Sequence, residues 1–182
     1  MFAPKTDGEL IGRALEGSER AWLALVRRHE KRLYNYALRM SGNPDDAMDI
    51  LQDVLLSVYR NLPSFRGDAK FSTWLFRIVS FRCTDYFRRK ALEEPCVDDG
   101  AVADPDDSRL PDTSLGNARD NREISRLMLT LSPDQRHVVE LKFFQHFTFD
   151  EIAGQLGISP NTAKTRLYAA IEKMRARVNL PG

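Results

Sequence analysis

The side chains best suited to chemistry in this chain are a polar, basic and aromatic group near its C-terminal end. They fall within eight residues: Asn161, Lys164, Thr165, Arg166 and Tyr168. Small polar side chains can hydrogen-bond to base edges in a major groove, while Lys and Arg bind phosphates. The group therefore predicts recognition of duplex DNA.

Two short helices are predicted to position this group. Thr148 and Glu151 form a capping box for the first helix, which ends at Gly157. Ser159 and Pro160 begin a second helix after a very tight turn. Apolar residues at helical spacing must turn the other face of the second helix inward: Ala163, Leu167, Ala170, Ile171 and Met174. The pattern is that of a helix-turn-helix, although such hairpins also occur as plain packing units.

A second candidate site combines aromatic rings with cations between Arg66 and Lys90. A helix from Phe71 onward is apolar nearly all round, so core packing can use only one stripe of its rings. Surplus rings interleaved with arginines suit single-stranded nucleic acid, since bases stack on the rings and phosphates bind the cations. A buried helix with a basic solvent edge explains the same composition about equally well.

A third candidate site lies on the helix that begins after Asn43 and Pro44 and runs to about Asn61. Its buried stripe is predicted to be Ala47, Ile50, Leu51, Val54, Val58 and Leu62. The opposite face carries Asp49, Gln52, Asp53 and Leu56. We hypothesise that this face docks a protein partner, because an apolar residue there lies among acids. A single exposed leucine is nevertheless ordinary.

Charge is balanced over the whole chain but segregated along it. The 27 Lys and Arg residues oppose 26 Asp and Glu residues, a formal net charge of +1. Basic residues predominate in the aromatic segment, whereas residues 93–120 are acidic and contain three prolines. We expect this acidic stretch to be a flexible tether, or alternatively to lie in a cationic channel meant for nucleic acid.

These patterns predict an all-α fold of two small helical domains. The expected division is residues 1–91, a flexible acidic linker at 92–120, and a helix-turn-helix domain at 121–182. Cys83 and Cys96 are too far apart to suggest a zinc site or a disulfide framework, and we expect no metal and no cofactor. The N-terminus lacks an apolar leader and no stretch approaches membrane-spanning length, so a cytoplasmic protein without membrane insertion is expected.

Catalysis is not expected. The sequence offers no carboxylate pair at metal spacing, no phosphate-binding glycine loop and no nucleophile beside a base. We therefore predict that the protein is not an enzyme, has no small-molecule substrate and acts by recognition.

The order of these parts resembles the extracytoplasmic function (ECF) family of bacterial RNA polymerase sigma factors. The resemblance covers almost the whole chain. Two segments carry it most specifically: DAMDILQDVLLSVYRNLPSFRGDAKFSTWLFRI at 46–78 and LSPDQRHVVELKFFQHFTFDEIAGQLGISPNTAKTRLYAAIEKMR at 131–175. The resemblance implies a factor that binds core RNA polymerase, directs it to promoter DNA and helps open the strands. It also implies an anti-sigma factor as a partner.

The resemblance assigns roles to the three candidate sites. The minus ten element would be captured by Arg66, Asp68, Lys70, Phe71, Trp74, Arg77, Phe81 and Arg82. The clamp helices of the largest polymerase subunit would bind Asp49, Gln52, Asp53 and Leu56. The minus thirty-five element would be read by Lys164, Thr165, Arg166 and Tyr168, beside Asn161.

Two positions depart from the family pattern. Phe81 stands where many members carry a polar residue that helps hold the flipped base, and Ala169 stands where relatives often have a basic residue. Both bear on promoter sequence. The alternative function is a stand-alone helix-turn-helix regulator, which would bind duplex DNA unaided and would leave the aromatic segment and the docking face unexplained.

Overall fold

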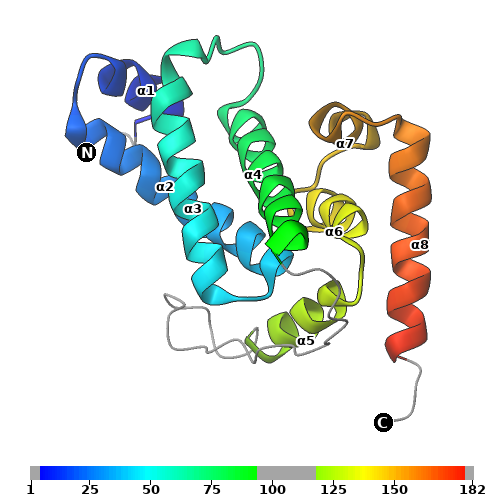
Figure 1. Cartoon of the computed structure of the whole chain (residues 1–182). Coiled ribbons are helices and arrows are strands. Elements are labelled where there is room, and N and C mark those ends of the chain that lie inside the picture. The colour runs from blue at the N-terminus through cyan, green and yellow to red at the C-terminus, as the bar shows by residue number, and fades with distance from the viewer. Residues whose placement is uncertain (1–4, 94–117, 179–182) are drawn as a thin grey trace.

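The computed structural model describes residues 5–93 and 118–178, and these parts are helical with no strand among them (Figure 1). The N-terminal helices are α1 (Asp7–Leu15), α2 (Glu19–Ser41), α3 (Pro44–Asn61), the 3₁₀ turn η1 (Leu62–Ser64) and α4 (Phe71–Glu93). The C-terminal helices are α5 (Ala118–Leu129), α6 (Pro133–Val139), the π-helical turn η3 (Glu140–Phe144), α7 (Phe149–Leu156) and α8 (Pro160–Val178). The predicted all-α class is confirmed. Most of the predicted linker, together with Cys96, lies outside the described residues.

The helix boundaries follow the capping residues. The Asn43 side chain accepts hydrogen bonds from the backbone N–H groups of Asp45 and Asp46, at 2.8 and 3.2 Å, and Pro44 occupies the first turn of α3. Thr148 and Glu151 complete their capping box at the start of α7. Gly157 ends α7 in the left-handed conformation, with φ of 65°, which glycine adopts without a Cβ penalty. The predicted helix-turn-helix geometry is therefore present.

Helix α3 buries the stripe that its sequence predicts. All six of those apolar residues are buried, packing α3 against α2 and α4. Cys83 is fully buried on α4, and burial raises the pKa of its thiol. Packing rather than reactivity therefore explains this cysteine.

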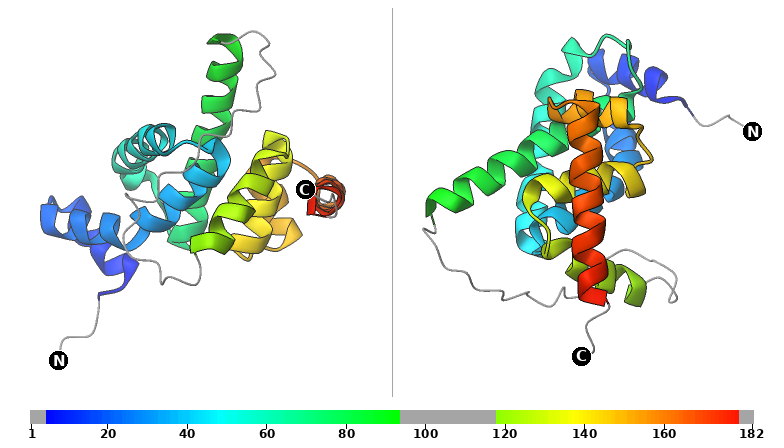
Figure 2. Two further views of the ribbon diagram at one scale, coloured as in Figure 1. Left: turned by 90° about the horizontal axis from the view of Figure 1, so that it is seen from below. Right: turned by 90° about the vertical axis from the view of Figure 1, so that its right-hand side faces the viewer.

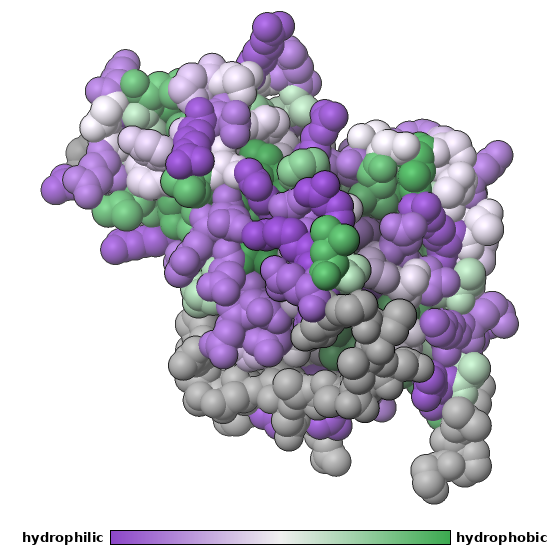
Figure 3. All heavy atoms as spheres, viewed as in Figure 1, coloured by the Kyte–Doolittle hydropathy of each residue, from purple (hydrophilic) through white to green (hydrophobic). Residues whose placement is uncertain are grey.

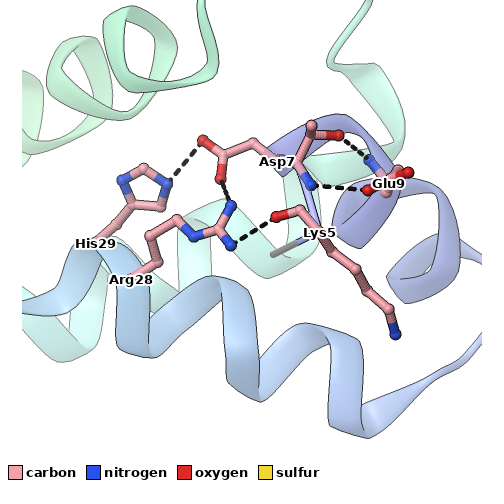
Figure 4. A network of polar contacts seen from close by, with 6 residues as sticks. Lys5, Asp7, Glu9, Arg28 and His29 are labelled. Atoms are coloured by element: carbon pink, nitrogen blue, oxygen red, sulfur yellow. Dashed lines mark hydrogen bonds and ion pairs between the residues drawn. The ribbon is translucent and has the colours of Figure 1, made fainter. Parts of the chain in front are cut away.

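Polar contacts fix α1 to α2 (Figure 4). Arg28 Nη1 donates to Asp7 Oδ1 at 2.6 Å, and Asp7 Oδ2 lies 3.0 Å from His29 Nε2. Burial lowers the pKa of His29, and the Asp7 carboxylate partly opposes this shift. This network stays inside the N-terminal domain.

The two domains pack against each other. In the described part of the chain, buried side chains from both domains form one continuous cluster. Figures 1 and 2 show α5 and α6 against the N-terminal helices, with α8 on the outer side of α6. No helix in residues 5–93 and 118–178 has the length and apolar character that a bilayer crossing requires.

Candidate nucleic-acid interface

Helix α8 presents the predicted duplex-reading group to solvent. Asn161, Lys164, Thr165 and Tyr168 are exposed, whereas Ala163 and Leu167 on the other face are buried. The α8 face is therefore unobstructed by the N-terminal helices, which lie beyond α6 (Figure 2).

Arg166 differs from the rest of this group. Its Nη2 lies 3.1 Å from Asp134 Oδ2 at the start of α6, and the Arg166 side chain is about one-third exposed. This ion pair holds the guanidinium at the edge of the face. Lys164 also has a local contact, because its Nζ lies 5.6 Å from the centroid of the Phe149 ring.

A basic surface formed by the loop before α4 and by α4 itself is the second nucleic-acid candidate. Arg66, Asp68 and Lys70 are exposed on the loop, and Arg77 and Phe81 are exposed on α4. A groove of about 440 Å³ contains the loop, Trp74 and Arg77 in its lining. Its mixture of cations and an aromatic edge can bind phosphates and stack a base. We call this set the loop–α4 surface.

Phe71 lies elsewhere than the resemblance suggested. Only 6% of it is exposed, and its ring stacks on Trp74 at 5.6 Å and meets His29 edge-on at 5.4 Å. Phe71 is therefore a core residue that supports the loop–α4 surface and has no free ring face for a base. Because α4 is apolar on nearly every side, its sequence does not show which of its rings are buried.

Arg82 has an anchor that the sequence reasoning missed. Its Nε and Nη2 donate to Ser57 Oγ at 3.0 and 2.6 Å, which connects α4 to the buried face of α3. The guanidinium carbon also lies 5.8 Å from the centroid of the Phe81 ring. A serine in an apolar stripe carries no obvious sequence signal of this role.

The predicted docking face lies on the exposed side of α3. Asp49 and Gln52 are exposed, Asp53 is half-buried and Leu56 is 48% exposed. Asp53 Oδ2 lies 3.6 Å from Arg89 Nη2, across a polar groove of about 470 Å³ between α3 and α4. Tyr59, which sequence reasoning did not single out, is 61% exposed one turn beyond Leu56 and contacts the Trp22 ring.

Hydrophobic residues do not gather into one large patch on the face drawn in Figure 3. They form separate green groups among hydrophilic side chains. The described part of the chain is thus all-helical and has two candidate nucleic-acid surfaces. One is the exposed face of α8, and the other is the loop–α4 surface.

Comparison with protein families supports two regions in the same order. Residues 25–93 match sigma-70 region 2, and residues 121–174 match sigma-70 region 4. The ECF RNA polymerase sigma factor SigM of Mycobacterium tuberculosis is 31% identical over 91% of this chain and 81% of its own length. SigW of Bacillus subtilis is 29% identical over 92% of this chain and 94% of its own length. The chain belongs to the ECF family of RNA polymerase sigma factors.

Solved structures show the same fold. The sigma factor RpoE, solved with the anti-sigma factor NepR from Bartonella quintana, has a TM-score of 0.68 at 21% identity, covering 86% of this chain and 96% of that one. CnrH, solved with the cytosolic domain of CnrY, has a TM-score of 0.65 at 24% identity, covering 93% of this chain and 95% of that one. At these identities the likeness concerns the fold.

Proposed function

We propose that this protein is an alternative sigma factor that binds core RNA polymerase, directs it to specific promoters and helps open the DNA. The observation that carries the proposal is the pair of matched sigma-70 regions in their expected order along a chain that belongs to the ECF family. The chain's own residues act by recognition and strand capture, and polymerase performs the chemistry. The protein is accordingly not an enzyme and works in the cytoplasm.

The loop–α4 surface is proposed to hold the melted non-template strand of the minus ten element. Arg66, Lys70 and Arg77 are the exposed cations for phosphates, and Phe81 is the exposed ring on which a base stacks. Asp68 lies among the loop cations, Trp74 lines the groove, and Arg82 is held in place by Ser57.

Helix α8 is proposed to read the minus thirty-five element as duplex DNA. Asn161, Thr165 and Tyr168 are exposed near its N-terminal end, where a recognition helix meets base edges. Lys164 and Arg166 flank them as phosphate contacts.

The exposed face of α3 is proposed to dock on polymerase. Leu56 supplies an apolar contact within a rim of Asp49, Gln52 and Asp53. Such a centre with a polar rim is typical of protein interfaces. We further propose an anti-sigma factor as a partner, since the relative RpoE was solved with one and the chain covers nearly all of RpoE.

Run-off transcription tests the function. Purified protein would be added to sigma-free bacterial core polymerase on a pool of genomic promoter fragments, and the start sites sequenced. Discrete starts preceded by a shared pair of elements are expected. The stand-alone regulator would instead shift duplex DNA without polymerase and yield no transcripts.

A variant of the docking face and a matched control sharpen this experiment. Leu56→Asp adds a charge to the centre of the proposed docking face while leaving the α3 core stripe intact. We expect it to lose transcription and polymerase binding but to keep its helical content. Glu30→Gln, on the exposed side of α2, serves as a surface change outside the three sites.

A further inference from the structure

An acidic side chain on α6 contacts an arginine of the duplex-reading helix α8. Asp134 lies in the first turn of α6, and its Oδ2 is 3.1 Å from Nη2 of Arg166. The two helices pack side by side (Figures 1 and 2), and Val138 of α6 and Leu167 of α8 are both buried. Because this packing fixes the backbone on both sides, the ion pair lies at the edge of the exposed α8 face.

The ion pair contributes little to the stability of the fold. The Asp134 side chain is 66% exposed and that of Arg166 is 30% exposed, so water screens the attraction between the two charges. An arginine that is held this weakly can exchange its carboxylate partner for another anion, such as a DNA phosphate. The effect of Asp134 therefore concerns DNA binding more than folding.

The pair changes how Arg166 meets DNA. A cation that contacts a phosphate releases counterions, which favours binding to any duplex regardless of its sequence. Asp134 offsets the charge of Arg166 and places a carboxylate near the position that a phosphate would take, where like charges repel. Arg166 gains a phosphate only by giving up the carboxylate, so it adds little to non-specific binding.

Lys164 provides a contrast on the same helix. It is exposed, and its Nζ lies 5.6 Å from the centroid of the Phe149 ring. A ring attracts a cation without neutralising its charge, whereas a carboxylate cancels that charge. Lys164 is therefore available to any phosphate, while the contact of Arg166 is conditional on exchange with Asp134.

We propose that Asp134 is a specificity-determining residue, which positions Arg166 and reserves it for a duplex that is bound in register. Base contacts from the exposed face of α8 hold the correct element close, and their gain offsets the exchange of carboxylate for phosphate. Other sequences lack these base contacts, so Arg166 stays with Asp134. Specificity is the ratio of specific to non-specific binding, and the pair raises it by lowering the non-specific side. This inference rests on the proposed reading of duplex DNA by α8.

The first test measures non-specific duplex binding by the full-length protein. Asp134→Asn removes the carboxylate charge, and anisotropy of a fluorescein-labelled 20-bp duplex of mixed sequence reports affinity. We expect tighter binding with the salt dependence of about one extra phosphate contact. The ratio of variant to wild-type affinity should then be roughly threefold larger at 50 mM than at 200 mM salt. Asp134→Glu keeps the charge and should behave like wild type; an unchanged salt dependence in Asp134→Asn would overturn the proposal.

Two further variants separate the role of Arg166 from that of net charge. Asp150→Asn makes the same charge change in the first turn of α7 and should alter the salt dependence much less. Adding Asp134→Asn to an Arg166→Gln protein should have no further effect, because the residue through which Asp134 acts is gone. An equal change in Asp150→Asn, or an undiminished effect in the Arg166→Gln background, would show that Asp134 does not act through Arg166.

The second test measures specificity with polymerase. Transcription would be compared on a promoter fragment from the run-off experiment and on the same fragment with its minus thirty-five element scrambled. Asp134→Asn should lower the ratio of the two signals severalfold, and an unchanged ratio would refute the role in specificity. Run-off transcription with wild-type protein decides the proposed function separately, because the duplex measurements need no polymerase.

Discussion

At the scale of single residues, Phe81 has the most exposed ring on α4, at 65%. Its ring projects beside Arg82 on the loop–α4 surface. We predict that Phe81→Ala weakens binding of melted promoter DNA by about 1–3 kcal/mol, the usual contribution of one base–aromatic stack. Fluorescence anisotropy with a fluorescein-labelled single-stranded 20-mer of mixed sequence and run-off transcription would measure the loss. Phe81→Tyr keeps the ring and should retain most binding; equal affinities for the alanine variant and wild type would contradict the stacking role.

Ser57 is predicted to matter through Arg82. Ser57→Ala removes the acceptor of both guanidinium bonds, so Arg82 should become mobile and the single-strand affinity should fall severalfold. Loss of the bonds should also lower the free energy of unfolding by about 1 kcal/mol. Ser64→Ala is the control, since the Ser64 hydroxyl instead donates to the Asn61 carbonyl. A Ser57→Ala variant with unchanged DNA affinity would show that Arg82 needs no anchor.

Single residues also show what sequence reasoning can and cannot reach. The exposure of Leu56 follows from helical periodicity, because its neighbours one turn away on the wheel are polar. The burial of Phe71 does not follow from helical periodicity, because His29 and Phe65 pack against its ring from other elements. Roles that depend on a distant partner, such as Ser57 with Arg82, leave no local pattern.

At the scale of elements, two glycines of the helix-turn-helix make a matched pair. Gly157 has φ of 65°, while Gly154 lies within α7, and a Cβ added at either would meet no atom within 4 Å. Gly157→Ala should therefore cost about 1 kcal/mol of stability through backbone strain alone. Gly154→Ala should instead stabilise α7 by up to about 1 kcal/mol. Urea unfolding would compare the two, and a neutral Gly157→Ala would contradict the strain argument.

Helix starts can be predicted from the sequence, whereas the packing partners of a helix such as α4 cannot. Caps and prolines are local, so the starts of α3, α7 and α8 are apparent in the sequence. The surplus rings of α4 suggested nucleic acid, yet several pack on protein. Phe76 meets Phe147 edge-on at 6.0 Å, and Arg136 lies over Phe87 at 5.5 Å. Contacts with the C-terminal domain therefore account for rings of α4 that its own domain does not need for packing.

At the scale of the whole molecule, the domain arrangement was beyond sequence reasoning. The Arg39–Glu140 pair joins residues that are 101 positions apart. Nothing in periodicity or capping specifies such a pair. The same is true of His137, whose Nδ1 lies 2.7 Å from Tyr36 Oη of the N-terminal domain. Its position between the domains nevertheless has a measurable consequence.

Acidification is predicted to open the molecule. Burial lowers the pKa of His137 from 6.5 to about 3, and the charges of Arg136 and Arg166 add to this shift. Opening would return the imidazole to water, where its pKa regains the ordinary value. The closed state then binds fewer protons than the open state. Its advantage is complete above pH 6.5 and is lost as the pH falls from 6.5 toward 3.

Spin labels on Glu30→Cys and Ala176→Cys, two exposed positions, in a Cys96→Ser background measure the distance between the domains and hence this effect. Between about pH 7.5 and pH 5.5 the closed state should lose about 1.4 kcal/mol relative to the open state, a tenfold rise in the open-to-closed ratio. His137→Gln should abolish the pH response. His29→Gln should preserve it, because His29 bonds to Asp7 within the N-terminal domain although burial also lowers its pKa. A pH response that survives in His137→Gln would assign the proton to another group, and an absent response in wild type would mean that His137 stays buried when the domains part.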